Sequence, residues 1–301
     1  MSAPARSDAV TRPGARKALQ GIGQARTWLL AYPTIMLAVF FAVPFAIMVA
    51  TSFFRRDPTA FYQPDFVLSN YARLATPLFV NHLVFSLSLA VMMAAISVCI
   101  AFPFTYLLTR MRLRSQTLWL VFLLSVLSLS EVIVAFSWST LLSRTAGVSN
   151  LLVWLGLMSQ PVSWSPGFGA VVMGYLYLTL PYTVLMLYPP LSRLDPELTE
   201  AAQTMGASPV KAFLSVVVPA LRVPIMASLI LVFVFTLGVY LIPQILGRPQ
   251  HWTLSVLITD QAVFQANVPF AAALAVFLMA TSLALIALTF ILGRRRGRVA
   301  A

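Results

Sequence analysis

The chain has 301 residues, of which 60% are hydrophobic and only 9% are charged. Soluble domains carry about a quarter charged residues, so this chain has too little polar surface for a soluble globule. Its net charge of +12 is typical of a nucleic-acid binder, but the basic residues lie between long apolar runs, which indicates an integral membrane protein instead. A single cysteine, Cys99, excludes a disulfide framework, and two distant histidines, His82 and His251, argue against a metal centre.

The first 27 residues are polar and rich in Ala, Arg and Gly, and we predict that they form a cytoplasmic tail. A spanning helix needs about 20 apolar residues, and residues 28–54 are the first run without Asp, Glu, Lys or Arg. This run is too long for the apolar segment of a cleaved signal peptide, so it predicts a retained first span. Similar runs predict further spans at about residues 83–108, 117–142, 170–188, 223–243 and 268–292.

The basic residues predict the orientation of these spans, because cytoplasmic loops carry an excess of Lys and Arg. With six spans, one side receives fifteen of the twenty basic residues: Arg6, Arg12, Arg16, Lys17, Arg26, Arg110, Arg112, Arg114, Arg193, Lys211, Arg222, Arg294, Arg295, Arg296 and Arg298. The expected fold class is therefore an all-α membrane protein with one six-span domain over residues 28–293. Both termini, including a basic tail at residues 294–301, are expected in the cytoplasm.

The loop between the fourth and fifth spans, residues 191–222, is the largest predicted cytoplasmic segment and contains two helix starts. Asp195 and Ser208 are each followed by a proline, which is the pattern of an N-cap with proline at the first helical position. Gly206 lies between them, where the end of a helix needs a residue with positive φ. The pattern predicts a short helix, a sharp turn and a second helix that ends before Pro219. On these signals alone, a hairpin lying on the membrane surface is an equally good interpretation.

The same loop contains Glu200-Ala201-Ala202, then three residues, Gly206, nine residues and Val216-Val217-Val218-Pro219. This pattern resembles the EAA loop of the permease subunits of binding-protein-dependent ABC importers, which reads Glu-Ala-Ala, three residues, Gly, nine residues and Ile-x-Leu-Pro. The resemblance implies the type I importer fold. It also implies that the acid, the two alanines and the glycine form a coupling hairpin, which docks into a separate ATP-hydrolysing subunit.

Other segments, within roughly residues 80 to 290, resemble the spermidine/putrescine-type permeases of this family. They are Ser130–Trp138, Gly147–Asn150, Leu180–Tyr182, Gly238–Pro243 and Leu246-Gly247. Related permeases for phosphonates, iron and other small solutes share versions of these motifs, so another organic solute is the alternative to a polyamine. Polyamine permeases often carry an acid after the glycine of the fifth-span motif, where this chain has Val239.

The resemblance implies a set of partners. They are two copies of an ATP-binding subunit, a second permease that is identical or related, and a periplasmic solute-binding protein, all assembled at the lipid bilayer of the bacterial inner membrane. The chain contains no phosphate-binding loop sequence. ATP and Mg²⁺ are therefore expected on the partner ATPase, and we expect no catalytic residue, metal or cofactor in this chain and no nucleic-acid partner.

Six residues of the predicted spans are candidates for the solute path: Glu131, Trp138, Tyr175, Thr179, Tyr182 and Tyr240. A carboxylate at membrane depth usually faces the bundle interior or a watery cavity, and Glu131 is the only acid inside a predicted span. Aromatic rings attract ammonium groups through cation–π interactions, which suits the tyrosines and Trp138. Packing between helices is the alternative role for all six.

Two other classes of protein compete with the importer. An intramembrane enzyme needs clustered Ser and His, paired acids or metal ligands at membrane depth, whereas this chain offers Glu131 and two scattered histidines. A secondary transporter that works without an ATPase normally carries more intramembrane ionisable residues for ion coupling, and it has no need of the Glu-Ala-Ala and Gly hairpin.

Overall fold

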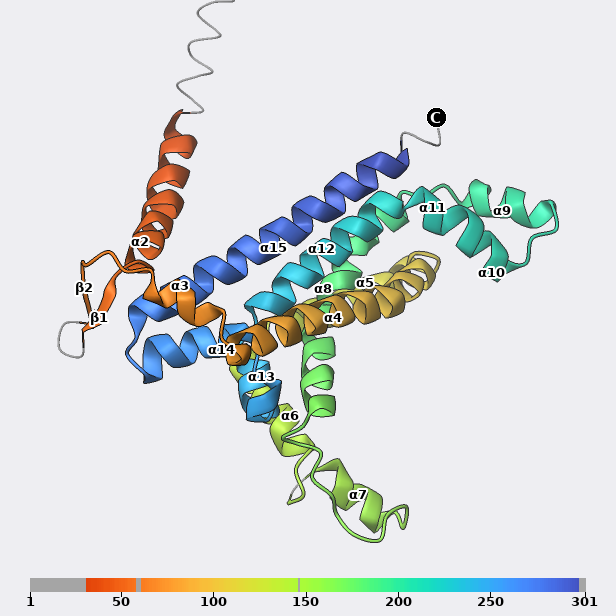
Figure 1. Ribbon diagram of the computed structural model, residues 1–301. Coiled ribbons are helices and arrows are strands. Elements are labelled where there is room, and N and C mark those ends of the chain that lie inside the picture. Colours follow the sequence, from red (N-terminus) through yellow and green to blue (C-terminus); the bar gives the residue numbers. More distant parts are fainter. Residues whose placement is uncertain (1–30, 58–60, 146, 298–301) are drawn as a thin grey trace, which may run out of the picture. The chain divides into compact units, whose positions relative to one another are not determined.

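The computed structural model describes residues 31–57, 61–145 and 147–297, so the predicted tail at residues 1–27 and the last four residues of the basic tail lie outside it (Figure 1). The chain divides into two compact units, Met1–Thr51 and Ser52–Ala301. In the first unit, residues Ala31–Thr51 form one helix of 21 residues. Its middle, η1 (Ala38–Ala42), is wound as a π-helix and continues into α2 (Val43–Thr51). Pro44 has no N–H to donate to the preceding turn, which explains the wider winding there.

The second unit is helical except for one β-hairpin, among the residues described. Its elements in chain order are β1 (Arg55–Asp57), β2 (Phe61–Gln63), α3 (Ser69–Leu74), α4 (Pro77–Thr109), α5 (Leu113–Leu127), α6 (Glu131–Leu141), α7 (Val148–Trp154), α8 (Phe168–Ser192), α9 (Pro196–Thr204), α10 (Pro209–Ala212), η2 (Phe213–Val217), α11 (Val218–Ala220), α12 (Arg222–Gly238), α13 (Leu241–Leu246), η3 (Pro249–His251), α14 (Leu254–Thr259), η4 (Asp260–Phe264) and α15 (Val268–Gly297). The antiparallel strands β1 and β2 pair Arg56 with Tyr62.

Four helices of the described chain are long and apolar enough to cross a membrane: Ala31–Thr51, Pro77–Thr109, Phe168–Ser192 and Val268–Ala287. Two bent pairs, α5 with α6 and α10–α11 with α12, raise the number to six if each pair is one span. The protein is thus a mostly helical membrane protein with four to six candidate spans. The helix predicted from residue 83 begins earlier, at Pro77, because the proline suits the first helical position.

The span predicted over residues 117–142 is not one continuous helix. Helix α5 ends at Leu127, α6 begins at Glu131, and the two axes are bent by 93°. Ser125 and Ser128 donate their hydroxyls to the carbonyls of Val121 and Leu124, at 2.8 and 2.9 Å, and such back-bonding weakens and bends helices. Ser130 then adopts an extended conformation as the N-cap of α6. Glu131 therefore lies at the start of a helix and not on the face of a continuous one.

Three further expectations need correction. The fifth span, predicted over residues 223–243, is interrupted after Gly238 and resumes as α13 at Leu241. The second helix of the cytoplasmic loop runs past Pro219 to Ala220, because the π-helical turn η2 just before the proline accommodates its missing N–H. The segment after α6, where two prolines and four glycines in residues 147–169 predict a loop, contains the short helix α7, whose Ser149 donates to the carbonyl of Ser143 at 3.3 Å.

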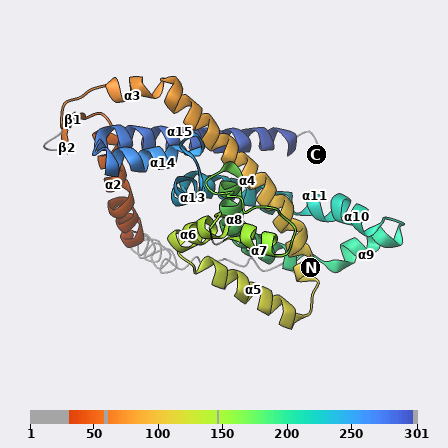
Figure 2. The ribbon, with the colours of Figure 1, turned by 90° about the horizontal axis from the view of Figure 1, so that it is seen from below.

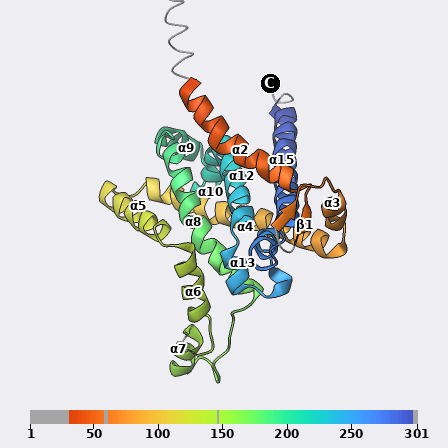
Figure 3. The ribbon, with the colours of Figure 1, turned by 90° about the vertical axis from the view of Figure 1, so that its left-hand side faces the viewer.

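The core of the second unit lies where α4 packs along α8 and α12. Small and hydroxyl residues permit this close packing. Ser97 of α4 and Thr179 of α8 share a buried hydrogen bond of 2.7 Å, and a Cβ added at Gly174 of α8 would lie only 2.7 Å from Leu246 Cδ1 of α13. Figures 1 and 2 show that the α9–α10 hairpin projects beyond one end of this bundle, and Figure 3 places α7 at the other end of α8.

Candidate functional site

The α9–α10 hairpin is stabilised by caps within its own sequence. The Asp195 carboxylate accepts the backbone N–H of Glu197 at 3.0 Å, and the Ser208 hydroxyl oxygen accepts the N–H of Lys211 at 3.3 Å. Both N-caps stand where the sequence predicted them, each followed by a proline in the first turn. These bonds satisfy amides that an uncapped helix would leave without partners.

Gly206 forms the turn between the two helices. Its φ of +89° is unfavourable for any residue with a side chain, whereas a Cβ at this position would meet no atom within 4 Å. The Ala207 N–H reaches back to the carbonyl of Ala202 at 3.0 Å, which closes the carboxyl end of α9. The glycine is thus required by backbone geometry and not by lack of space.

The exposed surface of the hairpin combines acidic and apolar residues. Glu200 and Ala201 are exposed, and so are Leu198, Met205, Val210 and Leu214, with Met205 83% accessible. Ala202 differs, because it is 6% exposed and packs inside the hairpin. Pro219 is exposed just before the chain bends by 75° into α12. The surface available to a partner subunit therefore includes Glu200 and Ala201 but little of Ala202.

Contacts that the sequence analysis did not identify attach the hairpin to α4. The ring of Phe213 lies between those of Phe102 and Tyr106, with centroid separations of 5.3 and 5.0 Å. Arg110, at the end of α4, donates to the Thr199 hydroxyl of α9 at 3.3 Å and covers the Tyr106 ring at 5.1 Å. Phe213 lies within the EAA-like pattern, so an aromatic residue there was the available signal. Nothing in the sequence indicated its partners.

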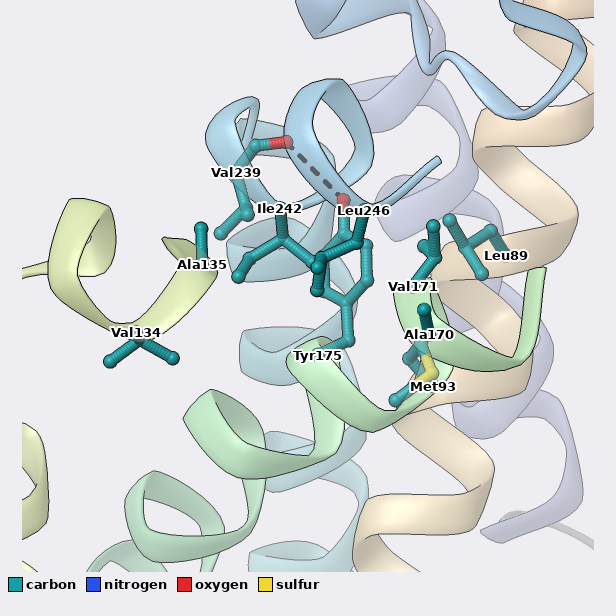
Figure 4. Packing of buried hydrophobic residues seen from close by; sticks show 10 residues of the cluster. All are labelled: Leu89, Met93, Val134, Ala135, Ala170, Val171, Tyr175, Val239, Ile242 and Leu246. Carbon is teal, nitrogen blue, oxygen red and sulfur yellow. Dashed lines mark hydrogen bonds between the residues drawn. The ribbon is translucent and has the colours of Figure 1, made fainter. Parts of the chain in front are cut away.

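The second part of the site is the interruption between α12 and α13. Carbonyl groups released at such a break need partners, because water is scarce at membrane depth. The Tyr175 hydroxyl lies 3.4 Å from the carbonyl oxygen of Thr236 and 3.3 Å from that of Val239, and the Ser255 hydroxyl donates to Val239 at 2.9 Å. Figure 4 shows Tyr175 pointing from α8 at Val239, beside Ile242 and Leu246.

Glu131 meets the other side of the same interruption. Helix α13 begins with the backbone amides of Leu241 and Ile242, and it packs against α6, whose first residue is Glu131. Its Oε1 is buried and has no hydrogen-bond partner among the described residues. Tyr240, half-buried, directly precedes these amides. Glu131, Tyr175 and Tyr240 are thus brought together around the break, although they belong to three different helical regions.

The other three candidates lie apart from the break. Thr179 is wholly buried and pairs with Ser97, and Tyr182 stacks on Phe235 of α12 at 5.5 Å. Trp138 makes an edge contact with Tyr177 at 6.2 Å between α6 and α8. Each is therefore engaged in helix packing within this subunit. A role for any of them in contacting solute stays a prediction.

The polar turn between α13 and α14 contacts the segment at the start of α8. Arg248 donates to the carbonyl of Pro166 at 3.1 Å, and the His251 ring lies 5.8 Å from Phe168. Partial burial lowers the pKa of His251, and the Arg248 guanidinium lowers this pKa further.

Among the residues that the structure describes, no three His, Cys, Asp or Glu side chains gather as metal ligands.

Comparison with known proteins shows which proteins this chain resembles in sequence. No family model matches the chain. The spermidine/putrescine transport system permease protein PotB of Salmonella typhimurium strain SL1344 is 28% identical over 242 residues, which cover 80% of this chain and 84% of PotB. PotB of Escherichia coli K12 is also 28% identical, over 80% of this chain and 88% of its own. The inner membrane ABC transporter permease protein YdcU of Escherichia coli K12 is 26% identical over 72% and 73% of the two chains.

The fold agrees with these sequence relationships. A chain of a bacterial ABC transporter involved in the import of the acidic polysaccharide alginate superposes with a TM-score of 0.70 over 93% of this chain and 99% of its own, at 19% identity. By sequence and fold, this chain is similar to permease subunits of ABC importers. The chain is accordingly a multi-pass protein of the inner membrane, and its sequence resembles polyamine permeases, as its motifs indicated.

Proposed function

We propose that the permease forms the transmembrane path for a polyamine such as putrescine or spermidine, or for a related small organic cation. The sequence relationship to PotB carries this proposal, because it extends over 80% of the chain. The half-buried rings of Trp138, Tyr182 and Tyr240 suit an organic cation, since aromatic faces attract ammonium groups. Val239 provides no acid in the fifth-span motif, so aromatic faces supply most of the attraction in this proposal.

The α9–α10 hairpin is proposed as the docking element for the ATP-hydrolysing subunit. Its caps and the turn at Gly206 make it rigid, and its exposed Leu198, Met205 and Val210 offer apolar surface to a groove. Contact between Phe213 and α4 lets movement of the hairpin pass into the spans. A rigid element transmits such movement, whereas a mobile loop would absorb it.

Six spans and cytoplasmic termini belong to the same proposal. Each bent pair supplies one span, which brings the number to six. The carboxyl end of α15 lies at the same end of the bundle as α9 in Figures 1 and 3, as expected if residues 294–301 share the cytoplasmic side with the hairpin. The basic residues listed above favour the same orientation.

The proposed assembly contains two ATPase subunits, a second permease and a periplasmic solute-binding protein. A complex of the related alginate transporter with its oligosaccharide-bound periplasmic protein illustrates the last of these partners. ATP and Mg²⁺ would be held by the ATPase, and this chain would carry out no covalent chemistry. Alternating access driven by the ATPase would then move the solute.

Uptake by the reconstituted assembly tests the substrate. Proteoliposomes that contain the permease, its ATPase and its binding protein should accumulate labelled spermidine or putrescine only when ATP is supplied. ATP-driven uptake of a phosphonate without polyamine uptake would reject the cation and leave the importer in place. Gradient-driven uptake by the permease alone would reject the importer.

Cysteine crosslinking tests the docking surface. Cys99 is the only cysteine in the sequence, so Cys99→Ser provides a background without reactive thiols. In that background, Ala201→Cys should crosslink to the ATPase with a short bifunctional reagent. Leu155→Cys, which is similarly exposed but follows α7 at the other end of the bundle, is the control and should not. If Ala201→Cys formed no crosslink to the ATPase, the docking role would be overturned.

A further inference from the structure

Helix α5 carries an open apolar groove along one of its faces. The groove has a volume of about 360 Å³ and is lined by Ser115, Leu118, Trp119 and Phe122. These residues are three or four positions apart on the helix, so they form a strip about 10 Å long. Figures 2 and 3 place α5 at the edge of the second unit. Leu118 and Phe122 are 71% and 56% exposed, so the described part of the chain leaves the strip open to a ligand.

The Trp119 ring is fixed at the centre of this groove. It makes edge contacts with Phe104 of α4 and with Phe122, at centroid separations of 5.4 and 5.9 Å, and it is still 40% exposed. Tryptophan is enriched at the level of lipid headgroups, because its apolar body and polar N–H suit the boundary between hydrocarbon and water. The groove therefore has the chemistry of a membrane interface.

Two arginines lie at the amino end of the groove. Arg112 is the N-cap of α5 and Arg114 is its second residue, and both are exposed. Neither guanidinium makes a hydrogen bond or an ion pair within the described residues. Helices α4 and α5 contain no Asp or Glu, so no acid of these two helices neutralises the two charges.

The turn that carries Arg112 is held by a side-chain amide. The Gln116 amide nitrogen donates to the carbonyls of Thr109 and Met111, at 3.2 and 2.8 Å. The Gln116 amide oxygen accepts the hydroxyl of Tyr188, on α8, at 2.7 Å. Both N–H groups and the oxygen are thus used within the protein. A turn fixed in this way keeps its basic residues beside the groove before a ligand binds, which lowers the entropic cost of binding.

Charge distinguishes between the possible occupants of the groove. A phosphate group suits two neighbouring guanidinium groups, because arginine pairs with phosphate through parallel hydrogen bonds. An acyl chain suits the apolar strip that follows. A protein partner would have to bring acids, and a second copy of this chain has few to offer. Three of its eight acidic residues lie in residues 195–200, on the hairpin proposed to dock the ATPase.

We propose that the groove of α5 binds one anionic phospholipid of the cytoplasmic leaflet, with its phosphate paired with Arg112 and Arg114 and one acyl chain along the strip. Basic pockets beside spanning helices recognise anionic headgroups on the cytoplasmic side in this way. The choice of leaflet follows from Arg110 of the same turn, which donates to Thr199 of the α9–α10 hairpin. The proposal therefore rests on the orientation proposed above and does not depend on the solute.

Quenching of Trp119 by brominated lipids tests the site. The assembled complex is placed in phosphatidylcholine nanodiscs that contain an increasing fraction of dibromo-phosphatidylglycerol or of dibromo-phosphatidylcholine. The emission of Trp119 is the difference between the wild type and Trp119→Phe. A basic residue near an anionic lipid contributes about fivefold to affinity. The brominated phosphatidylglycerol should therefore quench this emission at a mole fraction about fivefold to twentyfold lower.

Substitutions of the arginines separate this site from general attraction to anionic lipid. Arg112→Gln combined with Arg114→Gln should remove the preference, so that both lipids quench alike. Arg55→Gln combined with Arg144→Gln removes the same charge from exposed positions outside the turn and should preserve the preference. Equal quenching by the two lipids in the wild type would overturn the proposal, because the groove would then face bulk lipid. Absence of quenching by either lipid would also overturn it, and would assign the groove to a protein partner.

Native mass spectrometry decides the question if Trp119→Phe does not assemble. Released from nanodiscs that contain phosphatidylglycerol, the wild-type complex should retain one more molecule of this lipid per copy of the chain than the variant with Arg112→Gln and Arg114→Gln. Equal retention would contradict the headgroup site. A nanodisc offers the same lipids to both faces, so these results stand even if the proposed orientation fails.

Discussion

The α9–α10 hairpin and the break between α12 and α13 are both irregular segments of this chain, but they are stabilised in opposite ways. The hairpin is held by groups close in sequence, such as Asp195 with Glu197 and Ser208 with Lys211. The break is held by groups far apart, because Tyr175 and Ser255 both reach it from other helices. A local structure can move as a unit, whereas a structure made of distant contacts changes only when its neighbours move.

The largest expected effect comes from the turn of the hairpin. Gly206→Val places a β-branched residue at φ +89°, which such residues avoid. We expect at least about a tenfold loss of solute-stimulated ATP hydrolysis in the reconstituted complex, with normal membrane insertion, since a left-handed conformation costs about 1–2 kcal/mol for an ordinary residue. Gly206→Asn is the matched control, because asparagine tolerates positive φ. Equal activity of the two variants would contradict a backbone role.

The contact between α8 and α13 tests the distant type of stabilisation. Gly174→Val adds a Cβ that would lie 2.7 Å from Leu246 Cδ1 and 2.9 Å from Ile242 Cγ2. Overpacking of this kind costs about 1–3 kcal/mol, so the thermal unfolding midpoint of the purified complex should fall. Gly169→Val, in the first turn of the same helix, meets nothing within 4 Å and should leave the midpoint unchanged. A fall of the same size in both variants would show that helix propensity, not crowding, is responsible.

Phe213 joins the two regions of the comparison, because it belongs to the hairpin and packs on α4. Aromatic pairs contribute about 0.5–1.5 kcal/mol beyond the area that they bury, so Phe213→Ala should reduce coupling by about fivefold. The ratio of transported solute to hydrolysed ATP measures this loss. Val210→Ala, at an exposed position of α10, controls for changes in docking. Normal coupling in Phe213→Ala would mean that movement reaches the spans by another contact.

The smallest effect is expected between α4 and α8. Ser97 and Thr179 share a buried hydrogen bond of 2.7 Å, and such bonds within membrane proteins average about 0.6 kcal/mol. A double-mutant cycle of Ser97→Ala and Thr179→Val, followed by thermal unfolding, should return a coupling energy of about that size. If instead the Thr179→Val variant alone abolished solute uptake while unfolding normally, Thr179 would belong to the solute path.

The sequence could predict the hairpin because its signals are local. Two caps, two prolines and Gly206 determine the backbone without help from other segments. The breaks in the third and fifth spans were not predicted, although Ser130 before Glu131 carries a weak N-cap signal. Apolar composition alone does not distinguish a straight helix from an interrupted one, and the groups that satisfy the interruption lie many residues away. The same reason explains why the sequence predicts one span over residues 117–142, with Glu131 inside it.

The 75° bend at the end of α11 has a mechanical consequence. Val217, just before α11, is wholly buried against the cluster that contains Leu108 and Leu187, so the pivot is fixed within the bundle. A displacement along the axis of the Pro209–Ala220 helix would then act on α12 largely at right angles to the α12 axis, because the two axes are bent by 75°. If the hairpin docks on the proposed ATPase, each movement of that ATPase would tilt α12 sideways more than it would shift α12 along its own axis.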